Sequence, residues 1–450
     1  MTSRIDSWAS HRVIDAAPAA QAAPARSGLI RDRFDALALV LIVGHGLYWT
    51  LMPALTTGTF ALDTGEALFW GREWQLGYYK HPPLMAWLAE SGVAVFGRSL
   101  VAVYLVPQLC VAAAFAAMWW LARRLVSSAG ALLALAALML VLPFTVGSPT
   151  FNANIALLPF WAWTIAFAWD ALERNEAWRW LRLGLVVGLG FLAKYAILIL
   201  CAAIALYCLR TPSRRWVLRA RGPWLAVAAA VLVASPHLYW LLREDELPLA
   251  YATASKAVTA ISEALPQFGL FVAHQGLIYL PLLVVAALWA IASGRRIGVV
   301  RVSRDGVDRQ PLRFLLFAGF APVVVTVAAA LATRQKPPMS WGDCFPIVAG
   351  LLACLAWPWL ARDLAEGRAP RAAPGAFAAL VLALWAAPPV RLLAWAGVGL
   401  APPKTAFDGA AHGAILDAFW AQRRQQPLRY QVSHFGDADD RALGSSTAFF

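Results

Sequence analysis

Charged residues are scarce in this chain of 450 residues. Asp, Glu, Lys and Arg together make up 14% of the sequence, whereas hydrophobic residues make up 60% and the mean hydropathy is +0.61. Soluble domains carry about 25% charged residues. A chain with so little polar surface would aggregate in water, so the composition excludes a set of soluble domains. It indicates a polytopic membrane protein whose apolar surface mostly faces lipid.

Cysteines are few, and the common motifs of soluble enzymes are missing. The chain has five cysteines, four of them in apolar runs, and no Cys-x-x-Cys pair or Cys/His spacing of the kind that binds zinc. A Gly-rich phosphate loop, a Walker motif and a Ser/His/Asp nucleophile signature are also lacking. The sequence therefore indicates neither a disulfide framework nor a zinc site, and the thiols are expected to be small buried side chains.

Long apolar runs recur along the chain, close to the 20 or so residues that a spanning helix needs. We expect spans near residues 35–55, 100–122, 127–146, 151–170, 182–193, 196–209, 223–242, 267–293, 314–333, 343–361 and 374–399. The predicted fold class is an all-α polytopic membrane protein with about eleven transmembrane helices in residues 35–399. Residues 1–34 are predicted to be a disordered cytoplasmic leader, and residues 400–450 a short periplasmic tail.

The formal net charge of +13 lies in short loops between the apolar runs, so it does not form a basic face for nucleic acid. Arginine clusters near span ends favour the cytoplasm and place the N terminus inside. With that orientation all five lysines fall on the outer side: Lys80, Lys194, Lys256, Lys336 and Lys404. Either an Arg-rich composition splits this way by chance, or the outer face binds an anion with compact ammonium groups.

One apolar run conflicts with a simple count of crossings. Residues 183–209 are flanked by arginines at both ends, so a single crossing would place one of these clusters outside. A turn at Lys194-Tyr195 removes the conflict, and it also avoids a lone lysine at the centre of a lipid-facing helix. We therefore predict two short helices with the turn near the outer surface.

The first outer loop, predicted over residues 56–99, is the part of the chain richest in polar and aromatic side chains. Residues 62–88 are LDTGEALFWGREWQLGYYKHPPLMAWL. Asp63 and Glu66 share a face if a helix begins here, either as a capping-box-like start or as catalytic carboxylates. Pro82-Pro83 would hold the preceding polar cluster in an extended backbone. Carboxylates, an ammonium group and an imidazole held together outside the bilayer suit general-base chemistry on an anionic substrate.

The pattern of this loop resembles the first periplasmic loop of the family 39 glycosyltransferases. These are bacterial relatives of the dolichyl-phosphate-mannose protein mannosyltransferases, and they include the lipid A aminoarabinose transferases. The resemblance rests on Asp63-x-x-Glu66, Trp70, Gly77-Tyr78-Tyr79-Lys80-His81-Pro82-Pro83-Leu84 and Trp87. The family's loop often has Asp-Glu-Ala-Glu, where this chain has Asp63-Thr64-Gly65-Glu66. Looser matches, which extend the resemblance over roughly residues 35–360, are Asn152 and Asn154, residues 188–195, Ser235-Pro236-His237-Leu238-Tyr239-Trp240, and Trp341 after Lys336-Pro337-Pro338.

This resemblance implies a GT-C-type helical bundle in the bacterial inner membrane. Its expected activity is inverting transfer of a hexosyl or pentosyl group from a polyprenyl-phosphate donor to an envelope acceptor (lipid A or lipopolysaccharide, another glycan, a lipid or a protein) on the periplasmic side. Asp63 is the expected general base, and Glu66 either orients the acceptor or holds a divalent cation. The residues expected to bind the donor phosphate are Lys80, His81, Lys194, Tyr195 and Lys336. Those expected to bind substrate are Tyr78, Tyr79, Asn152, Asn154, Arg243 and Trp341.

Some of these residues also have plain structural explanations. Asn152 and Asn154 can cap a span, Arg243 can be a solvated helix end, and His237 can pack or form a hydrogen bond near a span end. A rival function is a transporter or flippase of a polyprenyl-linked sugar. Transporters tend to show repeated halves with matching broken helices, whereas this chain has one break and no convincing repeat.

Overall fold

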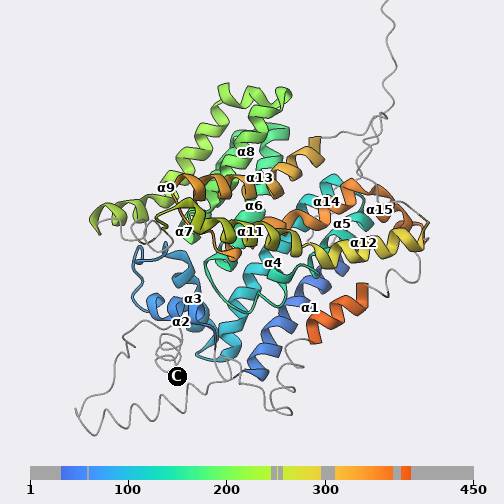
Figure 1. Cartoon of the computed structure of the whole chain (residues 1–450), viewed down its shortest axis with the longest axis horizontal. Coiled ribbons are helices and arrows are strands. Elements are labelled where there is room, and N and C mark those ends of the chain that lie inside the picture. The colour runs from blue at the N-terminus through green and yellow to red at the C-terminus, as the bar shows by residue number, and fades with distance from the viewer. Residues whose placement is uncertain are drawn as a thin grey trace, which may run out of the picture.

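The computed structural model describes residues 32–57, 60–244, 251, 257–294, 310–367, 375 and 377–386. The predicted leader and tail, with Lys256 and Lys404, lie outside the described residues, apart from the last three positions of the leader. The described part is a bundle of helices (Figure 1), whose only β-pairing is an isolated bridge between Ala257 and Gln335. The all-α prediction is confirmed.

The helices follow the apolar runs of the sequence. Their bounds are α1 Arg33–Thr56, α2 Leu62–Gly71, α3 Leu84–Phe96, α4 Leu100–Leu125, α5 Ser128–Leu138, η1 Leu142–Phe144, α6 Ala153–Arg174, α7 Ala177–Ala193, α8 Ile197–Arg210, η2 Pro212–Arg219, α9 Arg221–Arg243, α11 Ile261–Leu277, α12 Leu280–Ala292, α13 Gln310–Ala332, η3 Met339–Gly342, η4 Phe345–Val348, α14 Ala349–Ala356 and α15 Pro358–Ala365. A further apolar helix covers Phe377–Ala386.

Six of the described helical segments are long and apolar enough to cross a membrane, or eight if two bent pairs each count as one span. This identifies a multi-pass membrane protein, while the predicted count of eleven stays a prediction. Several expected spans have a different form, among them the span near 343–361, which is divided into η4, α14 and α15. The span near 127–146 is the 11-residue helix α5 followed by η1, because Pro143 begins a new turn. The span near 267–293 is bent by 42° between α11 and α12, where Pro281 lies at the start of α12.

The predicted turn at Lys194 is present and reverses the chain. Helix α7 ends at Ala193, and α8 begins at Ile197. Helix α9 then returns parallel to α7, since Gly222 lies against Trp180 and Gly184 against Ala226 further along both helices. A Cβ on Gly184 would lie 2.2 Å from the backbone oxygen of Ala226. Small residues thus allow the two backbones to touch, as is common between membrane helices.

Arginine side chains tie several helix ends together at one end of the bundle. Arg123, at the end of α4, pairs with Asp32 at the start of α1 (Nη2–Oδ2, 2.8 Å). Arg179 and Arg182 of α7 both pair with Asp170 of α6. Arg182 also lies over the ring of Trp120 on α4, at 5.5 Å. These contacts place the ends of α4 and α6 and the starts of α1 and α7 together.

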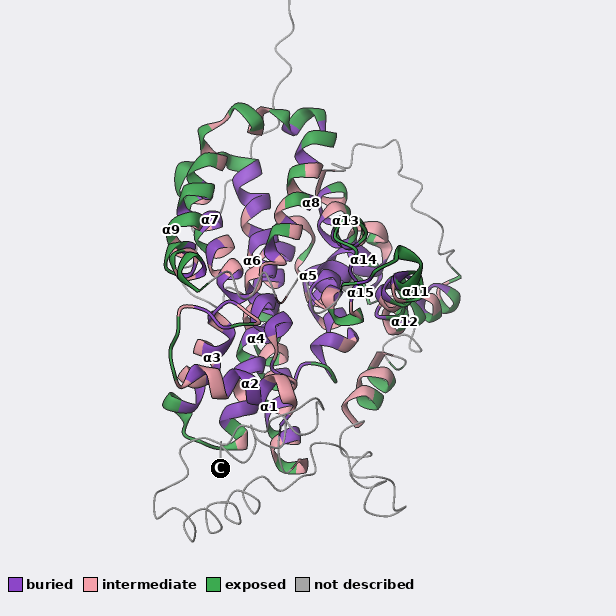
Figure 2. Cartoon of the chain, turned by 60° about the vertical axis from the view of Figure 1, so that its left-hand side comes forward, coloured by how far each residue is buried: buried purple, intermediate pink, exposed green. Residues whose placement is uncertain are grey.

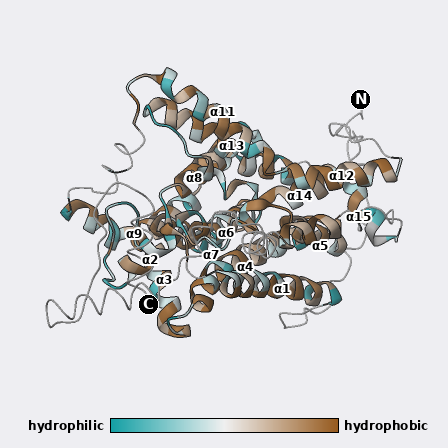
Figure 3. Cartoon of the chain, turned by 60° about the horizontal axis from the view of Figure 1, so that its bottom comes forward, coloured by the Kyte–Doolittle hydropathy of each residue, from teal (hydrophilic) through white to brown (hydrophobic). Residues whose placement is uncertain are grey.

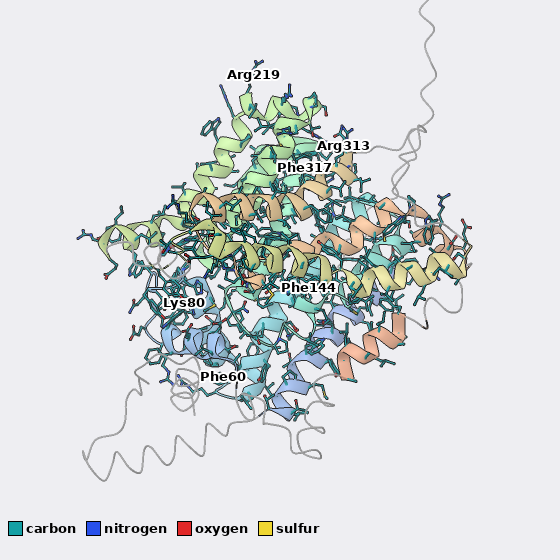
Figure 4. The ribbon with its side chains drawn as sticks, in the orientation of Figure 1. Phe60, Lys80, Phe144, Arg219, Arg313 and Phe317 are labelled. Carbon is teal, nitrogen blue, oxygen red and sulfur yellow. The ribbon has the colours of Figure 1, made fainter. Side chains whose placement is uncertain are left out.

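The next arginine cluster belongs to the same end of the bundle. Arg214 on η2 contacts the end of α6 through the carboxylate of Glu173, and the start of α13 through Gln310. Figure 4 shows Arg219 and Arg313 in the upper part of the view, away from Lys80 at the left. The arginine clusters therefore gather at one end, and Lys80 and the Lys194 turn lie toward the other.

Burial separates a central core from an outer apolar surface. Figure 2 shows the buried residues concentrated in α4, α5 and α6, where Phe115, Trp161 and Ile165 are fully buried. The outer helices are largely apolar in Figure 3, and Leu232 and Leu242 on α9 are 72% and 79% exposed. Exposed apolar side chains on long apolar helices match a surface that contacts lipid tails.

Candidate functional site

The first loop places two carboxylates and a lysine together. Helix α2 begins after Ala61, and no side chain caps it, so the alternative of a capping box at Asp63 and Glu66 is wrong. Instead the Nζ atom of Lys80 lies 2.7 Å from Oε2 of Glu66 and 3.7 Å from Oδ1 of Asp63. The residues lie 14 and 17 positions apart along the chain, so the loop must fold back over α2.

The two carboxylates differ in exposure. The side chain of Glu66 is 9% exposed and directly bonded to Lys80, whereas the side chain of Asp63 is 46% exposed. Burial by itself lowers the pKa of the Lys80 ammonium, but the Glu66 carboxylate and then Asp63 outweigh it and hold that pKa above its usual value. Glu66 thus fixes a charged Lys80, and Asp63 keeps an open face for a further partner.

Aromatic stacking fixes the fold of this loop. The rings of Trp70 and Tyr78 stack with centroids 5.4 Å apart, and Tyr79 meets Trp70 edge-on at 5.7 Å. The N–H of Tyr78 donates to the carbonyl of His81 at 3.1 Å, just before Pro82-Pro83 ends the turn. Tyr78 is buried, and Tyr79 is 43% exposed. Tyr78 therefore supports the loop, and Tyr79 is the tyrosine of the pair that remains accessible.

His81 is a neutral group in this environment. Burial, together with the nearby charges of Lys194 and Lys80, lowers the pKa of its imidazole to about 3. At neutral pH it can donate or accept a hydrogen bond but adds no positive charge. The sequence predicted that His81 binds the donor phosphate. As a neutral group it could do so only through a hydrogen bond, and the positive charge facing the phosphate would come from Lys80 and Lys194.

The turn between α7 and α8 contributes the second lysine. Nζ of Lys194 donates a hydrogen bond to Oδ1 of Asn154. Burial lowers the pKa of the Lys194 ammonium, although Cys344, Asp343 and Asp63 act in the opposite direction. The electrostatic influence of Asp63 on Lys194, and of both lysines on His81, shows that the first loop and this turn face one region.

The two asparagines at the start of α6 have different tasks. Oδ1 of Asn152 accepts hydrogen bonds from the N–H groups of Asn154 (2.9 Å) and Ile155 (3.1 Å), which makes Asn152 the N-cap of α6. Asn154 instead holds Lys194, and its backbone oxygen accepts a hydrogen bond from Sγ of Cys344 at 3.3 Å. Asn152 is thus a cap, and Asn154 belongs to the candidate site.

Several predicted residues stand apart from this cluster. The guanidinium of the exposed Arg243 lies over the ring of Tyr239 at 5.2 Å. Lys336 is exposed, and Trp341 packs against the core. In the described part of the chain none of these three forms a hydrogen bond or ion pair with the first-loop carboxylates or with Lys194. Roles for Arg243, Lys336 and Trp341 stay predictions.

Two residues near the site were not among the site residues predicted from the sequence. Asp343 influences Lys194 electrostatically and is the lone acid between η3 and η4, so an isolated carboxylate in an apolar run was its only signal. The second residue is His237. Its Nε2 and the hydroxyl of Tyr195 form a hydrogen bond of 2.7 Å, and its Nδ1 forms another of 2.7 Å with the carbonyl oxygen of Leu76. Its motif was visible, but its partners lie 42 and 161 positions away.

A divalent cation would need several carboxylate or other oxygen ligands in one place. The described residues contain no cluster of three or more His, Cys, Asp or Glu side chains that could hold a metal. Between Asp63 and Glu66 the ammonium of Lys80 already occupies the position of a cation. These residues do not fit a metal in this arrangement, and Glu66 is better described as the partner of Lys80.

An apolar cleft lies between α6, α7, α8 and α9. It has a volume of about 640 Å³ and is lined almost entirely by apolar side chains, from Trp224 and Val217 at the arginine end to Phe191 and Leu238 at the end near Lys194. Its lining on α9 runs from Pro223 to Leu238. Fifteen residues of helix correspond to about 22 Å, so the cleft could hold a long hydrocarbon chain.

Comparisons with known proteins agree with this arrangement. Residues 80–240 match the family of dolichyl-phosphate-mannose-protein mannosyltransferases. The chain is 27% identical over 328 residues to lipid A galacturonosyltransferase RgtD of Rhizobium johnstonii, covering 71% of this chain and 66% of RgtD. It is 28% identical over 219 residues to the undecaprenyl phosphate-alpha-4-amino-4-deoxy-L-arabinose arabinosyl transferase of Pseudomonas aeruginosa, covering 44% of this chain and 39% of that protein. The aligned part thus spans two thirds or less of these relatives.

The fold has a solved counterpart. The crystal structure of ArnT from Cupriavidus metallidurans bound to undecaprenyl phosphate superposes with a TM-score of 0.56 and 16% identity, covering 91% of this chain and 76% of ArnT. At that identity the likeness concerns the fold. It confirms the predicted GT-C-type bundle, and the matches together support the resemblance seen in the first loop rather than a flippase. The chain thus resembles the GT-C membrane glycosyltransferases of the ArnT and protein mannosyltransferase family, in fold over most of its length and in the matched sequence of residues 80–240.

Proposed function

We propose that this protein transfers a sugar from a polyprenyl-phosphate donor to lipid A or another part of lipopolysaccharide. The names of the relatives support the substrates: RgtD is a lipid A galacturonosyltransferase, and ArnT was crystallised with undecaprenyl phosphate. The observation that carries the proposal is the cluster of Asp63, Glu66 and Lys80 facing the same region as Lys194. A base and two cations are what transfer from a phosphate-linked sugar requires.

In the proposed reaction Asp63 is the general base. Its exposed carboxylate takes the proton from an acceptor hydroxyl, and the hydroxyl oxygen attacks the anomeric carbon of the donor sugar. The bond between that carbon and the phosphate oxygen breaks, the electron pair stays on the phosphate, and polyprenyl phosphate leaves with inversion at the sugar. Lys80 and Lys194 stabilise the charge that develops on the phosphate, and neutral His81 donates a hydrogen bond to it.

The donor's hydrocarbon tail is proposed to lie in the apolar cleft between α6 and α9. Phe191 and Leu238 line the end of this cleft, close in sequence to Lys194 and His237. A tail in the cleft would present its phosphate to the lysine end without exposing apolar surface to water, which is favourable by roughly 25 cal/mol per Å² of apolar area buried.

The reaction is proposed to occur on the extracytoplasmic side. The described arginine clusters gather at the end opposite the candidate site, and arginine-rich span ends favour the cytoplasm. The N terminus would then be cytoplasmic. Lys80, Asp63 and the Lys194 turn would lie at the outer surface, where envelope glycolipids are modified.

The test is sugar transfer by the purified protein in detergent. The protein is incubated with undecaprenyl-phosphate sugars, including galacturonate and aminoarabinose donors, and with lipid A, and the products are identified by mass spectrometry. Formation of glycosylated lipid A, absent with boiled protein, is the expected result. Movement of the lipid-linked sugar across sealed vesicles without transfer would instead support a flippase, because flipping requires two membrane faces and transfer does not.

A further inference from the structure

His237 lies where three distant segments of the chain meet. The imidazole on α9 contacts the hydroxyl of Tyr195 at the α7–α8 turn through Nε2, and the carbonyl of Leu76 in the first loop through Nδ1, both at 2.7 Å. Its ring is fully buried and stacks on Tyr195 and Trp240, with centroids 5.8 and 5.7 Å away. One side chain thus joins the two segments that carry Lys194 and Lys80.

The partners of His237 define its tautomer. A carbonyl oxygen only accepts, so Nδ1 must carry the proton that is donated to Leu76. In the neutral ring Nε2 is then unprotonated, and the Tyr195 hydroxyl donates to it. The hydroxyl of Tyr195 is therefore directed at His237 and not at the proposed phosphate, which argues against the direct phosphate contact expected from the sequence.

The backbone of the first loop is pressed against α9 at the same point. Gly77 follows Leu76, and a Cβ on Gly77 would lie 2.3 Å from Cε3 of Trp240. Only a glycine allows this approach without displacing the ring. Leu76 and Gly77 are thus seated on His237 and Trp240, and Lys80 follows Gly77 by three residues.

The Lys194 turn is held from two sides. Lys194 is extended (φ −165°, ψ 135°) and bonds to Asn154 on α6, while the next residue, Tyr195, bonds to His237 on α9. Adjacent residues are therefore anchored to different helices, and the second anchor continues through His237 into the first loop. Displacing a reacting group by about 1 Å can reduce a rate on the order of a hundredfold. Hydrogen bonds that hold Lys194 and the first loop in place would therefore affect the rate of transfer.

We propose that His237, held as the Nδ1–H tautomer by Tyr195 and Leu76, is a positioning residue that sets the separation of Lys80 and Lys194 in the donor phosphate site. This inference rests on the proposed function for its kinetic consequence. The tautomer and its two partners are properties of the fold and can be measured without any substrate.

The first experiment is ¹⁵N NMR of the protein with labelled histidine, in which the His237 signals are those absent from His237→Asn. The expected spectrum has a protonated Nδ1 and an unprotonated Nε2, and Tyr195→Phe shifts the Nε2 resonance while Nδ1 stays protonated. A protonated Nε2 with an unprotonated Nδ1, or an unchanged Nε2 resonance in Tyr195→Phe, would show that His237 does not make the proposed hydrogen bonds with Leu76 and Tyr195. This outcome is independent of whether the protein transfers sugar.

The second experiment measures kcat and KM for the donor in four proteins: wild type, Tyr195→Phe, His237→Asn and the double variant. Asn keeps an amide N–H near the position of Nδ1 and lacks an acceptor at the position of Nε2. Loss of the Tyr195 bond is expected to lower kcat/KM about fivefold to tenfold. The double variant is expected to match His237→Asn, because the hydroxyl has already lost its acceptor.

Independent losses that multiply in the double variant overturn the positioning role, since they would mean that Tyr195 acts on the substrate directly. Tyr239→Phe on the same helix is the matched control, because its ring is 56% exposed, and it should retain wild-type kcat/KM. Melting temperatures close to wild type in Tyr195→Phe exclude a purely structural effect. If the wild-type protein transfers no sugar while the NMR result is as expected, the proposed function is wrong and the hydrogen bonds of His237 with Tyr195 and Leu76 still stand.

Discussion

Asp63 and Glu66 lie one helical turn apart, yet their removal should have opposite consequences. Asp63→Asn removes an exposed carboxylate whose ion pair with Lys80 spans 3.7 Å. Pairs of this kind contribute about 0–1 kcal/mol to the free energy of unfolding. Loss of a general base lowers kcat about 10²- to 10⁴-fold, or roughly 3–5 kcal/mol of transition-state stabilisation. Asp63→Asn should therefore fold normally and transfer almost no sugar.

Glu66→Gln should show the reverse order. Glu66 is 9% exposed, and its carboxylate bonds the Lys80 ammonium at 2.7 Å. Replacing it by a neutral amide leaves Lys80 partly uncompensated, at a cost of about 1–3 kcal/mol. We expect a clear fall in melting temperature with a loss of kcat smaller than that of Asp63→Asn, on the order of tenfold if Lys80 shifts slightly.

Both variants are measured side by side for transfer rate, melting temperature and protein yield. The Asp63 assignment is refuted if Asp63→Asn transfers sugar within tenfold of wild type at equal protein level. It is also refuted if the activity lost by Asp63→Asn is matched by lost folded protein. If Glu66→Gln is instead the more inactive and the equally stable variant, Glu66 is the base and Lys80 has another task.

Three further outcomes follow from the geometry. Lys194→Met should raise the donor KM and also lower kcat, so that kcat/KM falls at least tenfold in the same transfer assay; an unchanged kcat/KM removes Lys194 from the phosphate site. Burial lowers the pKa of Lys194, so its positive charge is lost at a pH below 10.5, the ordinary pKa of lysine. In wild type the donor KM should therefore begin to increase before the pH reaches 10.5. A KM that stays constant up to pH 10.5 contradicts this. Gly184→Ala should lower the free energy of unfolding by about 1–3 kcal/mol, seen as a lower melting temperature, because the added Cβ would lie 2.2 Å from the backbone oxygen of Ala226. Gly44→Ala is the control: its added Cβ would have no atom within 4 Å, so this variant should melt at or above the wild-type temperature.

The apolar runs predicted most helices because the bilayer imposes a length and a composition on each of them. The break at Lys194 was predictable for the same reason, since a charge in the middle of a run and arginines on both flanks are properties of the chain alone. The bend between α11 and α12 was not predicted. Pro281 was visible, but a proline can also lie inside one continuous helix, as Pro236 does within α9.

The candidate site shows the same division between local and distant information. The polar residues of the first loop could be recognised in the sequence, because Asp63, Glu66 and Lys80 lie within 18 residues of one another. The sequence alone thus determined the membrane class and the residues of this loop, through composition and short-range pattern. Only the tertiary structure decided that Glu66 and not Asp63 is the close partner of Lys80, and that Asn152 is a cap while Asn154 holds Lys194. It also brought His237 to Leu76 across 161 positions, because such contacts depend on how helices pack and no local pattern encodes them.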